Sequence, residues 1–528
     1  MLIVLALLAL MGTIPTVIIA TTVNQMPLTT QNLDWNAAYE AAQAGLNDYL
    51  QQIDASASYT QWVTGADLCT GTSPVPTSAG GPGNDAFCTW ASSPSSTAPL
   101  STNPDEWFEY AVTESNGQVL LTVSGKAGSG PGAVVRTFRY AVAPAGATID
   151  NIYWTNHETV QGCSGGGTSC GIYFGSNDLL NGPVFSNDYF NMSGTPTFDG
   201  TVTSSVPSPY WRCNVNGQWA YGSSGCSPSA AQPNFNDGQP VHGANENLIA
   251  NGTSPDLAPS QALGCYIAGP GDSSTGVQMT ISGSTLTWTD ASGAANQPAT
   301  VQNGSTNPNT ASGACGTSGA TTNTVDLAKL RSPLIFVNGD ITLAGNNTVS
   351  GFATLVATGS ITIGGSITYP CHHITWQQGG ACPAMPTSQG TDTADALGLI
   401  AQDNILVQDN RSSVEIDAAM LAVSGSFANQ SPTTNCSGGG MGGGMGGGNG
   451  GCPVLAVFGS IAQNYRGVVG YLNGSGKTIE GFDKDYVYDQ SLATLWPPFF
   501  IPPAGATWVA RTYAELPAGA ANQAVPST

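Results

Sequence analysis

Two helical patterns occupy the first 54 residues of the chain. Residues 1–23 are apolar or weakly polar throughout, and no charged residue occurs before Asp34. Farther along, apolar side chains recur at the spacings of one helix face: Trp35, Tyr39, Ala42, Leu46, Leu50 and Ile53. We therefore expect an apolar helix of about 23 residues that continues into an amphipathic helix of about 25. Pro15 and Pro27 are expected to kink this helix or open it locally.

Short alternating strands are predicted from residue 107 onward. Apolar and polar side chains alternate in residues 107–112, 117–127 and 133–144, and a Gly/Pro-rich turn separates the last two segments. Such alternation is typical of strands with one buried face. Residues 55–104 show no such period, so we expect an irregular segment that leads into a small strand module.

A repeated phrase follows in the second half of the chain. Each copy has an apolar strand, a turn with Gly or Asp-Asn, and a second short strand; the copies span 334–345, 354–365, 398–409, 420–431 and 455–466. Gly339 and Gly359 lie 20 positions apart, Gly359 and Asp403 lie 44 apart, and Asp403 and Gly425 lie 22 apart. Repetition at this period is typical of a solenoid, in which each coil buries its apolar face against the next. Gly and Asn are expected to supply the corner conformations.

Composition supports a folded, turn-rich β protein. Charged residues make up only 8% of the 528 residues, whereas Gly (68) and Pro (34) are abundant. Disorder normally combines high charge with few aromatic residues, and this chain has 11 Trp, 17 Tyr and 15 Phe. The predicted fold class is mainly β, with a long N-terminal α-helix, a β-strand module and a parallel β-helix-like solenoid with disulfide-stapled loops. An antiparallel sandwich with similar hairpins is the alternative.

The predicted domains follow these patterns. Residues 1–54 form the hydrophobic and amphipathic helix, and residues 55–148 form the strand-rich module. Residues 149–516 form the β-helix-like ectodomain with insertions, and residues 517–528 form a tail.

Charge excludes one class of partner. The net charge is −22, with only 11 Lys and Arg residues. A nucleic-acid-binding protein needs basic side chains that displace phosphate counterions, so we expect no nucleic-acid partner. The same shortage of basic residues disfavours binding to anionic membrane surfaces.

Cysteine spacing indicates an exported protein. The 12 cysteines fall into six local pairs, each bracketing a stretch rich in Gly, Ser, Asn or Pro. None has the CxxC spacing of a metal site, so disulfides and an oxidising location are expected. The sequential pairs are Cys69–Cys88, Cys163–Cys170, Cys213–Cys226, Cys265–Cys315, Cys371–Cys382 and Cys436–Cys452. Each bond constrains the unfolded chain and contributes roughly 2–4 kcal/mol.

The N-terminal pattern resembles that of type IV pilins. The apolar helix runs into NAAYEAAQAGLNDYL (36–50), which is similar to the start of PilX-like minor pilins. In that family a prepilin peptidase cuts before the apolar segment, which waits in the inner membrane and then enters the filament core. Because no basic n-region precedes residues 1–23, either Met1 is the first residue of the processed chain or the segment is an unusual anchor. A plain signal anchor is the structural alternative.

One position departs from the pilin pattern. Many pilins carry Glu at the fifth position of the processed chain, where it is thought to pair with a neighbour's N-terminus, and this chain has Leu5 there. That departure leaves open whether the resemblance implies a major or a minor subunit. Residues 459–503 and the phrase LNGPVFSNDYF (180–190) also resemble bacterial pilus-associated proteins that join a PilX-like N-terminus to a repetitive β domain.

No cofactor or metal site is predicted. Cys371, His372 and His373 are adjacent, but Cys371 has a disulfide partner in Cys382 and adjacent histidines usually face solvent. Asp483, Asp485 and Asp489 lack EF-hand spacing for calcium. The run GGGMGGGMGGGNGG (438–451) lacks the Lys and Ser/Thr of a phosphate-binding loop, so it is expected to be a tethered flexible loop.

An enzyme is the less favoured interpretation. Parallel β-helices also carry polysaccharide-degrading sites, which need paired carboxylates or a base with bound calcium. The candidate residues would be Asp403, Asp409, Glu415 and Arg411. We favour turn positions for Asp403 and Asp409, because they flank a predicted strand.

The sequence therefore predicts a non-enzymatic structural subunit of an extracellular type IV pilus-like filament. The helix is expected in the filament core and the β ectodomain in the outer shell. Its partners would be copies of itself, the pilus assembly machinery and prepilin peptidase, with the inner membrane as the location before assembly. A low-copy tip adhesin is the alternative. The predicted assembly residues are Met1, Leu2, Leu5, Leu8, Ile14, Ile18, Ile19, Trp35, Tyr39, Leu46 and Leu50.

Overall fold

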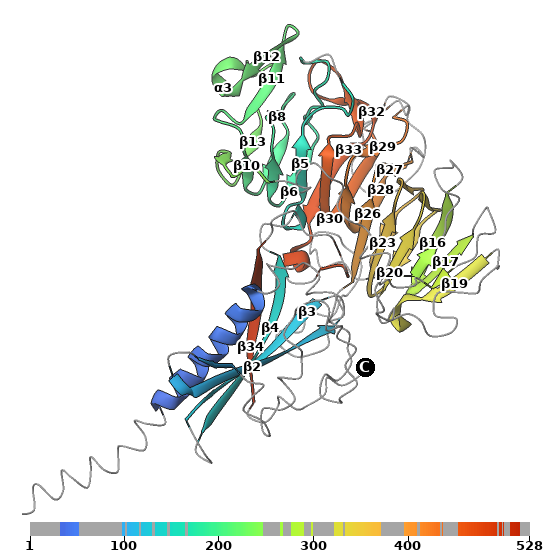
Figure 1. Cartoon of the computed structure of the whole chain (residues 1–528). Helices are drawn as coiled ribbons and strands as arrows, with labels where there is room; N and C mark the ends of the chain where they lie inside the picture. The colour runs from blue at the N-terminus through green and yellow to red at the C-terminus, as the bar shows by residue number, and fades with distance from the viewer. Residues whose placement is uncertain are drawn as a thin grey trace, which may run out of the picture. The chain divides into compact units, whose positions relative to one another are not determined.

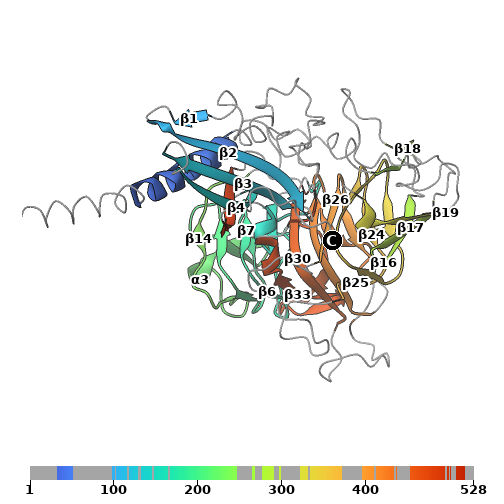
Figure 2. The same cartoon turned by 90° about the horizontal axis from the view of Figure 1, so that it is seen from below.

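A computed structural model gives the fold of the larger part of the chain. It describes residues 32–51, 98–100, 103–115, 118–128, 133–144, 148–163, 167–246, 265–267, 276–289, 297–298, 322–330, 333–370, 395–408, 412–432, 436, 452–493, 496–498, 500 and 507–517. These residues form two units, and each has its own hydrophobic core (Figures 1 and 2). The described part is mainly β with one long helix, which confirms the predicted fold class at that level.

The first unit packs the helix of residues 32–51 on a five-stranded sheet (Figure 1). The sheet order is β1 (Ala98–Leu100), β2 (Asn103–Ser115), β3 (Gln118–Ala127), β4 (Val134–Pro144) and β34 (Trp508–Leu516). The three segments predicted from alternation correspond to β2, β3 and β4. Paired residues of β3 and β4 run antiparallel from Val119–Val142 to Ala127–Val134.

The last strand of this sheet comes from the far end of the chain. Arg136 and Tyr140 of β4 contact Glu515 and Tyr513 of β34, so the two strands run in opposite directions. The end of β4 and the start of β34 therefore lie together. The predicted domain division had assigned residues 508–516 to the large β region, but β34 belongs to the sheet of the first unit.

The second unit, residues 144–507, is inserted between β4 and β34. Its first described element, η4 (Thr148–Asp150), contacts η7 (Gln490–Ala493) near its end. The chain thus enters and leaves this unit at neighbouring points. Such closeness is what permits one domain to interrupt another without disturbing its fold.

Ladders of parallel strands build the second unit. The longest ladder runs in the order β14 (Val241–His242), β10 (Val202–Ser204), β7 (Val184–Ser186), β5 (Tyr153–His157), β30 (Val454–Tyr465), β28 (Val414–Ala422), β26 (Ala396–Ala401), β23 (Phe352–Ala357), β20 (Leu334–Val337) and β15 (Cys265–Ile267).

Two further ladders share the same core. One contains β16 (Val277–Gly283), β21 (Ile341–Leu343), β24 (Ile361–Ile363), β27 (Ile405–Val407) and β29 (Phe427–Asn429). The other contains β22 (Asn347–Val349), β25 (Ile367–Thr368), β28, β30, β33 (Asp483–Tyr488), β6 (Leu179–Asn181), β9 (Thr197–Asp199) and β13 (Asn234–Phe235). Their inward side chains form one continuous apolar cluster.

The strand registers carry the offsets of the sequence repeat. Ile341 pairs with Ile361, 20 residues later, and Ile361 pairs with Ile405, 44 residues later. Ile405 then pairs with Phe427, 22 residues later. The repeated phrases therefore lie beside one another as neighbouring strands of a large, mostly parallel sheet.

The order of strands along the stack differs from their order in the sequence. The chain starts in the middle of the stack at β5 and runs outward to β14. It continues at the opposite end with β15 and winds back until β30 lies beside β5. In Figure 1 the orange-red β30 accordingly lies beside the teal β5, and Figure 2 shows the same neighbourhood for β33 and β6.

Three strands of the longest ladder, β20, β23 and β26, are buried on both faces. Every residue of β20 and β26 is buried, as are five of the six residues of β23. The Trp-Pro-Pro segment near residue 497 covers part of the outward face, since the Thr354 hydroxyl donates to the Pro498 carbonyl oxygen. This burial explains why these strands are apolar runs in the sequence rather than alternating ones.

An antiparallel hairpin lies at one end of the stack. β16 pairs with β17 (Thr285–Thr289), which pairs with β19 (Thr322–Asp326). β15 also pairs with β18 (Gln297–Pro298). The remaining described elements are β8 (Phe190–Asn191), β11 (Trp211–Val215), β12 (Gln218–Tyr221), α3 (Gly222–Gly225), η6 (Leu327–Lys329), β31 (Gly470–Leu472) and β32 (Thr478–Gly481).

Candidate assembly surface and buried ion pairs

The helix of residues 32–51 has one buried and one exposed face. Ala38, Ala42 and Tyr49 are fully buried against the sheet, and Leu46 is 6% exposed. Leu33, on the opposite side, is 64% exposed, and Trp35, at the N-terminal end of the side that faces the sheet, is 48% exposed. These exposed apolar side chains near the start of the helix, directly after an apolar N-terminal segment, form the surface that we consider for assembly.

Small residues bring the helix close to the sheet. A Cβ added to Gly125 of β3 would overlap the backbone of Ala38 and Ala42. A Cβ added to Gly45 would lie 2.7 Å from Val123 Cγ1 and 2.9 Å from Phe108 Cδ2. The helix and sheet backbones therefore approach closely because a side chain is absent from each element at the point of contact.

Arg136 connects the helix to the C-terminal strand. Its guanidinium lies 4.5 Å from the Trp35 ring centroid and 5.2 Å from that of Tyr39. The Arg136 Nε and Nη2 groups donate to the two carboxylate oxygens of Glu515, at 2.7 and 2.8 Å. The hydrogen bonds from Arg136 lower the pKa of Glu515, so this carboxylate stays ionised at neutral pH. Cation–π contacts and a bidentate ion pair thus meet at one side chain.

Tyr140 continues the row of aromatic rings that Trp35 and Tyr39 form around Arg136, which we call the aromatic strip. The Gln43 side-chain amide donates to the Tyr140 hydroxyl at 2.7 Å, and the Tyr140 and Tyr513 ring centroids lie 6.1 Å apart. Burial, with a smaller contribution from Tyr39, raises the pKa of Tyr140 to about 12. Tyr513 itself is 69% exposed, so the strip reaches the surface at β34.

The predicted helical stripe lies on the side of the helix that faces the sheet, but its burial is uneven. Ala42 and Leu46 are in the core and Leu50 packs beside it, as expected for the inward side. Trp35 and Tyr39 instead lie over Arg136 and are 48% and 38% exposed. Ile53 and the predicted assembly residues Met1, Leu2, Leu5, Leu8, Ile14, Ile18 and Ile19 lie outside the described residues.

Two buried ion pairs join the first and last coils of the second unit. Arg466 Nη1 donates to Glu158 Oε2 at 2.7 Å, and Lys484 Nζ donates to Asp178 Oδ2 at 2.6 Å. The side chains are at most 5% exposed. Each pair links residues more than 300 positions apart, and both lie where β30 and β33 meet β5 and β6.

Other contacts fix the Arg466 side chain. Its guanidinium lies 3.5 Å from the Phe174 ring centroid, and Nη1 also donates to the Ile172 carbonyl oxygen. The Tyr153 hydroxyl donates to Glu158 Oε1 at 3.2 Å. Burial raises the pKa of Glu158, and the positive charge of Arg466 opposes that rise. Burial lowers the pKa of Lys484, and the carboxylate of Asp178 opposes that fall.

The sequence alone did not indicate these charged residues. Arg136, Arg466 and Lys484 belong to a set of only 11 basic residues. The one available signal was that a rare basic residue lies among apolar neighbours in the sequence. A basic residue inside an alternating strand such as Asp483–Tyr488 indicates a charge that faces the core. The acidic partners are too distant in sequence to be paired by inspection.

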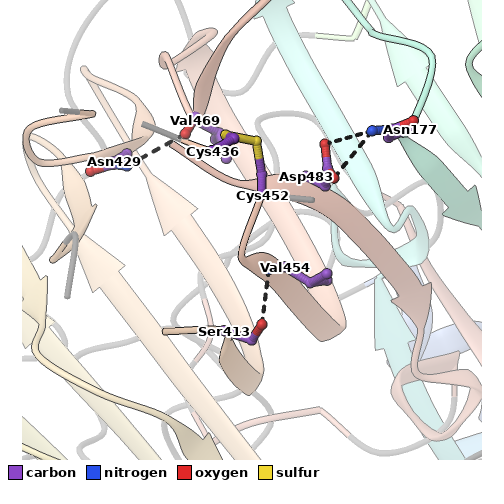
Figure 3. The surroundings of a disulfide bond; sticks show 8 residues. All are labelled: Asn177, Ser413, Asn429, Cys436, Cys452, Val454, Val469 and Asp483. Carbon is purple, nitrogen blue, oxygen red and sulfur yellow. Dashed lines mark hydrogen bonds between the residues drawn. A yellow bond between two sulfur atoms is a disulfide. The ribbon is translucent and has the colours of Figure 1, made fainter. Parts of the chain in front are cut away.

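Disulfides staple the loops of the second unit. The structure contains Cys163–Cys170, Cys213–Cys226 and Cys436–Cys452, and Cys265 is also disulfide-bonded. Figure 3 shows Cys436–Cys452 beside the start of β30 and β33, where Asn177 donates to both carboxylate oxygens of Asp483 and Val454 N donates to Ser413 Oγ. Cys69, Cys88, Cys315, Cys371 and Cys382 lie outside the described residues.

The candidate enzyme and metal residues do not gather into a site in the described part of the chain. Asp403 lies in the corner between β26 and β27 and accepts a hydrogen bond from Ser424. Glu415 lies on β28, whereas Asp409, Arg411, His372 and His373 are outside the described residues. Asp489 Oδ1 caps Ser491 N, and Asp485 lies on β33. No group of three metal-ligating side chains occurs among the described residues.

Comparisons with known proteins give limited matches. Residues 120–213 match a family model described as a domain of unknown function (DUF4900), a span that runs from β3 into β11. The competence-associated pilin ComZ from Thermus thermophilus is a similar solved structure, with 10% identity and a TM-score of 0.31 over 91% of this chain and 97% of that one. No curated protein matches the chain. Within the described ranges, no helix has the length and apolar character needed to cross a membrane.

Proposed function

We propose that the chain is a structural subunit of an extracellular, type IV pilus-like filament. The observation that carries the proposal is the helix of residues 32–51, which follows an uncharged apolar segment and packs on an antiparallel sheet through Ala38, Ala42 and Gly125. In the proposed filament, the helices pack in the core and the β unit forms the outer shell. Neighbouring copies of the chain are the partners.

The proposed route to the surface follows the pilin resemblance of the N-terminus. A prepilin peptidase would process the chain, the apolar segment would hold it in the inner membrane, and the pilus assembly machinery would insert it into the filament. The second unit would act as a parallel β-helix-like solenoid, an interpretation supported by its stacked parallel ladders and repeat offsets. Disulfides suit the oxidising environment outside the cell.

A charge in the apolar segment tests assembly. Leu8→Glu would place an uncompensated carboxylate in the helical core, so filaments should disappear in negative-stain images while the subunit remains in the membrane fraction. Ile479→Glu is the matched control, because Ile479 is 45% exposed in the second unit. Filaments that persist with Leu8→Glu and keep their normal diameter would contradict the core-helix proposal.

Mass spectrometry of native filaments tests the processing step separately. A methylated Met1 at the N-terminus is the expected result for a processed pilin. A mature chain that starts elsewhere, or an unmodified Met1, would contradict prepilin processing.

A low-copy tip adhesin is the second candidate, favoured by an exposed aromatic face described below. Abundance separates the two, since a major subunit forms many identical repeats along each filament and a tip protein does not. We also propose that the chain is not an enzyme; Asp403 accepts a hydrogen bond from Ser424 in a coil corner, which fits a structural role for this residue. Activity on uronic-acid polymers that is lost in Asp403→Ala would overturn this part of the proposal.

A further inference from the structure

A small sheet in the second unit has two chemically different faces. β8 pairs in parallel with β11, and β11 pairs with β12 in a hairpin closed by Asn216 and Gly217 (green in Figure 1). Side chains of adjacent strands that pair directly lie on the same face. The registers Asn191–Arg212, Arg212–Tyr221 and Asn214–Trp219 therefore define one face of this sheet.

The inward face is apolar and belongs to the core of the unit. Phe190, Trp211 and Cys213 are part of the main apolar cluster, and Val215 and Ala220 pack against it. The outward face, which we call the planar face, contains none of these. Its side chains are all rings, amides or a guanidinium: Tyr189, Asn191, Arg212, Asn214, Trp219 and Tyr221.

The side chains of the planar face form a continuous row. The Arg212 guanidinium lies 4.1 Å from the Trp219 ring centroid and 5.4 Å from that of Tyr189. Tyr189 meets Tyr221 edge-on at 5.1 Å, and Trp219 lies 5.9 Å from Tyr173 at the other end. Tyr221 is 40% exposed, and Tyr189 and Trp219 are partly exposed.

The buried end of the row, at Asn191, is held by hydrogen bonds. Arg212 Nε donates to Asn191 Oδ1 at 2.7 Å, and the buried Asn191 amide donates in turn to the Glu158 and Ile172 carbonyl oxygens. Two disulfides staple the same region, Cys213–Cys226 on β11 and Cys163–Cys170 in the loop before Tyr173. A ligand would therefore meet a guanidinium and strands that are already ordered, which lowers the entropy cost of binding.

The polar groups of the row are available to a ligand. Within the described residues, the Tyr189 and Tyr221 hydroxyls and the Trp219 indole N–H have no hydrogen-bond partner. The positive charge of Arg212 is offset by Asp188, whose Oδ1 lies 3.6 Å from Nη2. The face thus offers rings and uncharged hydrogen-bonding groups without a net charge.

We propose that the planar face binds a neutral glycan. Sugar rings present apolar C–H faces and a rim of hydroxyls, which match aromatic rings interleaved with hydroxyl, amide and indole groups. Protein interfaces also use Tyr, Trp and Arg, but a stable one takes about 20–30 residues from each partner, many more than the six of this row. Single-stranded nucleic acid also stacks on aromatic rings, but it requires a positively charged groove. The pairing of Arg212 with Asp188 and the net charge of −22 disfavour that ligand.

A binding assay with the full chain in detergent tests the proposal. Fluorescently labelled protein is incubated with four probes: cellulose, chitin, alginate and a single-stranded DNA oligonucleotide. We expect retention on cellulose or chitin that changes less than twofold between about 50 and 500 mM salt, since no ion pairs form. Tyr221→Ala should weaken that binding about tenfold, as expected for an aromatic contact residue.

Two variants keep the result interpretable. Tyr221→Phe retains the ring and should lose less affinity than Tyr221→Ala. Tyr471→Ala is the matched control, because Tyr471 is 49% exposed on β31 outside the planar face, and its binding should equal that of the native chain. Absence of binding to both neutral polymers overturns the proposal. Salt-sensitive binding to DNA or alginate, or equal loss in Tyr471→Ala, also overturns it.

Discussion

At the scale of single residues, the corners of the stack depend on side chains from the preceding coil. Asp340 Oδ1 accepts the Ser360 backbone N–H at 2.7 Å, and Asn404 Oδ1 accepts that of Ser426 at 2.9 Å. Asn346 and Ser366 form the same contact at 2.9 Å. Each acceptor thus satisfies a backbone donor about one coil later.

Glycine precedes each of these serines because the accepting side chain leaves no room for a Cβ atom there. A Cβ added to Gly359, Gly365 or Gly425 would overlap the oxygen of Asp340, Asn346 or Asn404, respectively. None of these three glycines has a left-handed φ, whereas Gly345 and Gly351 do, at 61° and 85°. The sequence-based expectation that corner glycines supply special backbone conformations therefore holds at only some of them.

The corner contact makes a prediction. Gly359→Ala should reduce the free energy of unfolding by about 1–3 kcal/mol, because the new methyl group displaces the Asp340 carboxylate from Ser360. Hydrogen exchange of peptides from β23 and β24 measures the effect. Combining it with Asp340→Ala should cost less than the sum of the two single changes, since the displaced oxygen is gone. Strict additivity would contradict the contact; Gly474→Ala, in open space, is the control.

At the scale of elements, the least predictable strand is β34. Residues 508–516 have a mixed pattern, and their partner β4 precedes them by the whole inserted unit. Local alternation was sufficient to predict β2, β3 and β4, because a hairpin pairs neighbours in sequence. Nothing in residues 508–516 specifies a partner so far away, so the sequence placed them in the wrong part of the fold.

The ion pair that holds β34 should weaken in acid. The pKa of Glu515 is lowered by hydrogen bonding to Arg136, so its stabilisation is present above the unfolded pKa of about 4.5 and is lost as pH falls through the lower folded value. Because Glu515 is 39% exposed, the effect is modest, about 0.2–1 kcal/mol.

Hydrogen exchange of residues 508–516, corrected for intrinsic rates, measures this loss. Protection in the native chain should decline below pH about 4.5, and Glu515→Gln should start lower and show a flatter decline. Glu480→Gln, in the second unit, serves as the control. Identical acid profiles for Glu515→Gln and the native chain would rule out the ion pair as the cause.

At the scale of the whole molecule, the sequence predicted the repeat but not its arrangement. The period of about 20 residues and three local disulfides are features of neighbouring segments, which inspection can detect. The order of the coils is set by the pairing of β30 with β5, which no local pattern encodes. The ion pairs of Glu158 and Asp178 were missed for the same reason.

The buried ion pairs lead to a prediction about the stability of the second unit. Lys484→Met leaves the Asp178 carboxylate buried without its partner, so the free energy of unfolding of the second unit should fall by about 3–5 kcal/mol. Denaturant titration followed by near-ultraviolet circular dichroism measures it. Asp178→Asn combined with Lys484→Met should recover most of the loss, because no unpaired charge remains. Lys477→Met, at an exposed position, should change little; a small effect of Lys484→Met would contradict the role of the pair.

Because the chain returns to its starting coil, pairing of the first strands of each unit depends on segments near the C-terminal end of the chain. β5 and β6 are made early, but their neighbours β30 and β33 come from the last part of the chain, and β4 waits equally long for β34. A polypeptide that is cut short anywhere in between leaves an open edge in both units. Only a chain that contains β30, β33 and β34 can pair these edges, so truncated copies are expected to expose unpaired strands that favour aggregation.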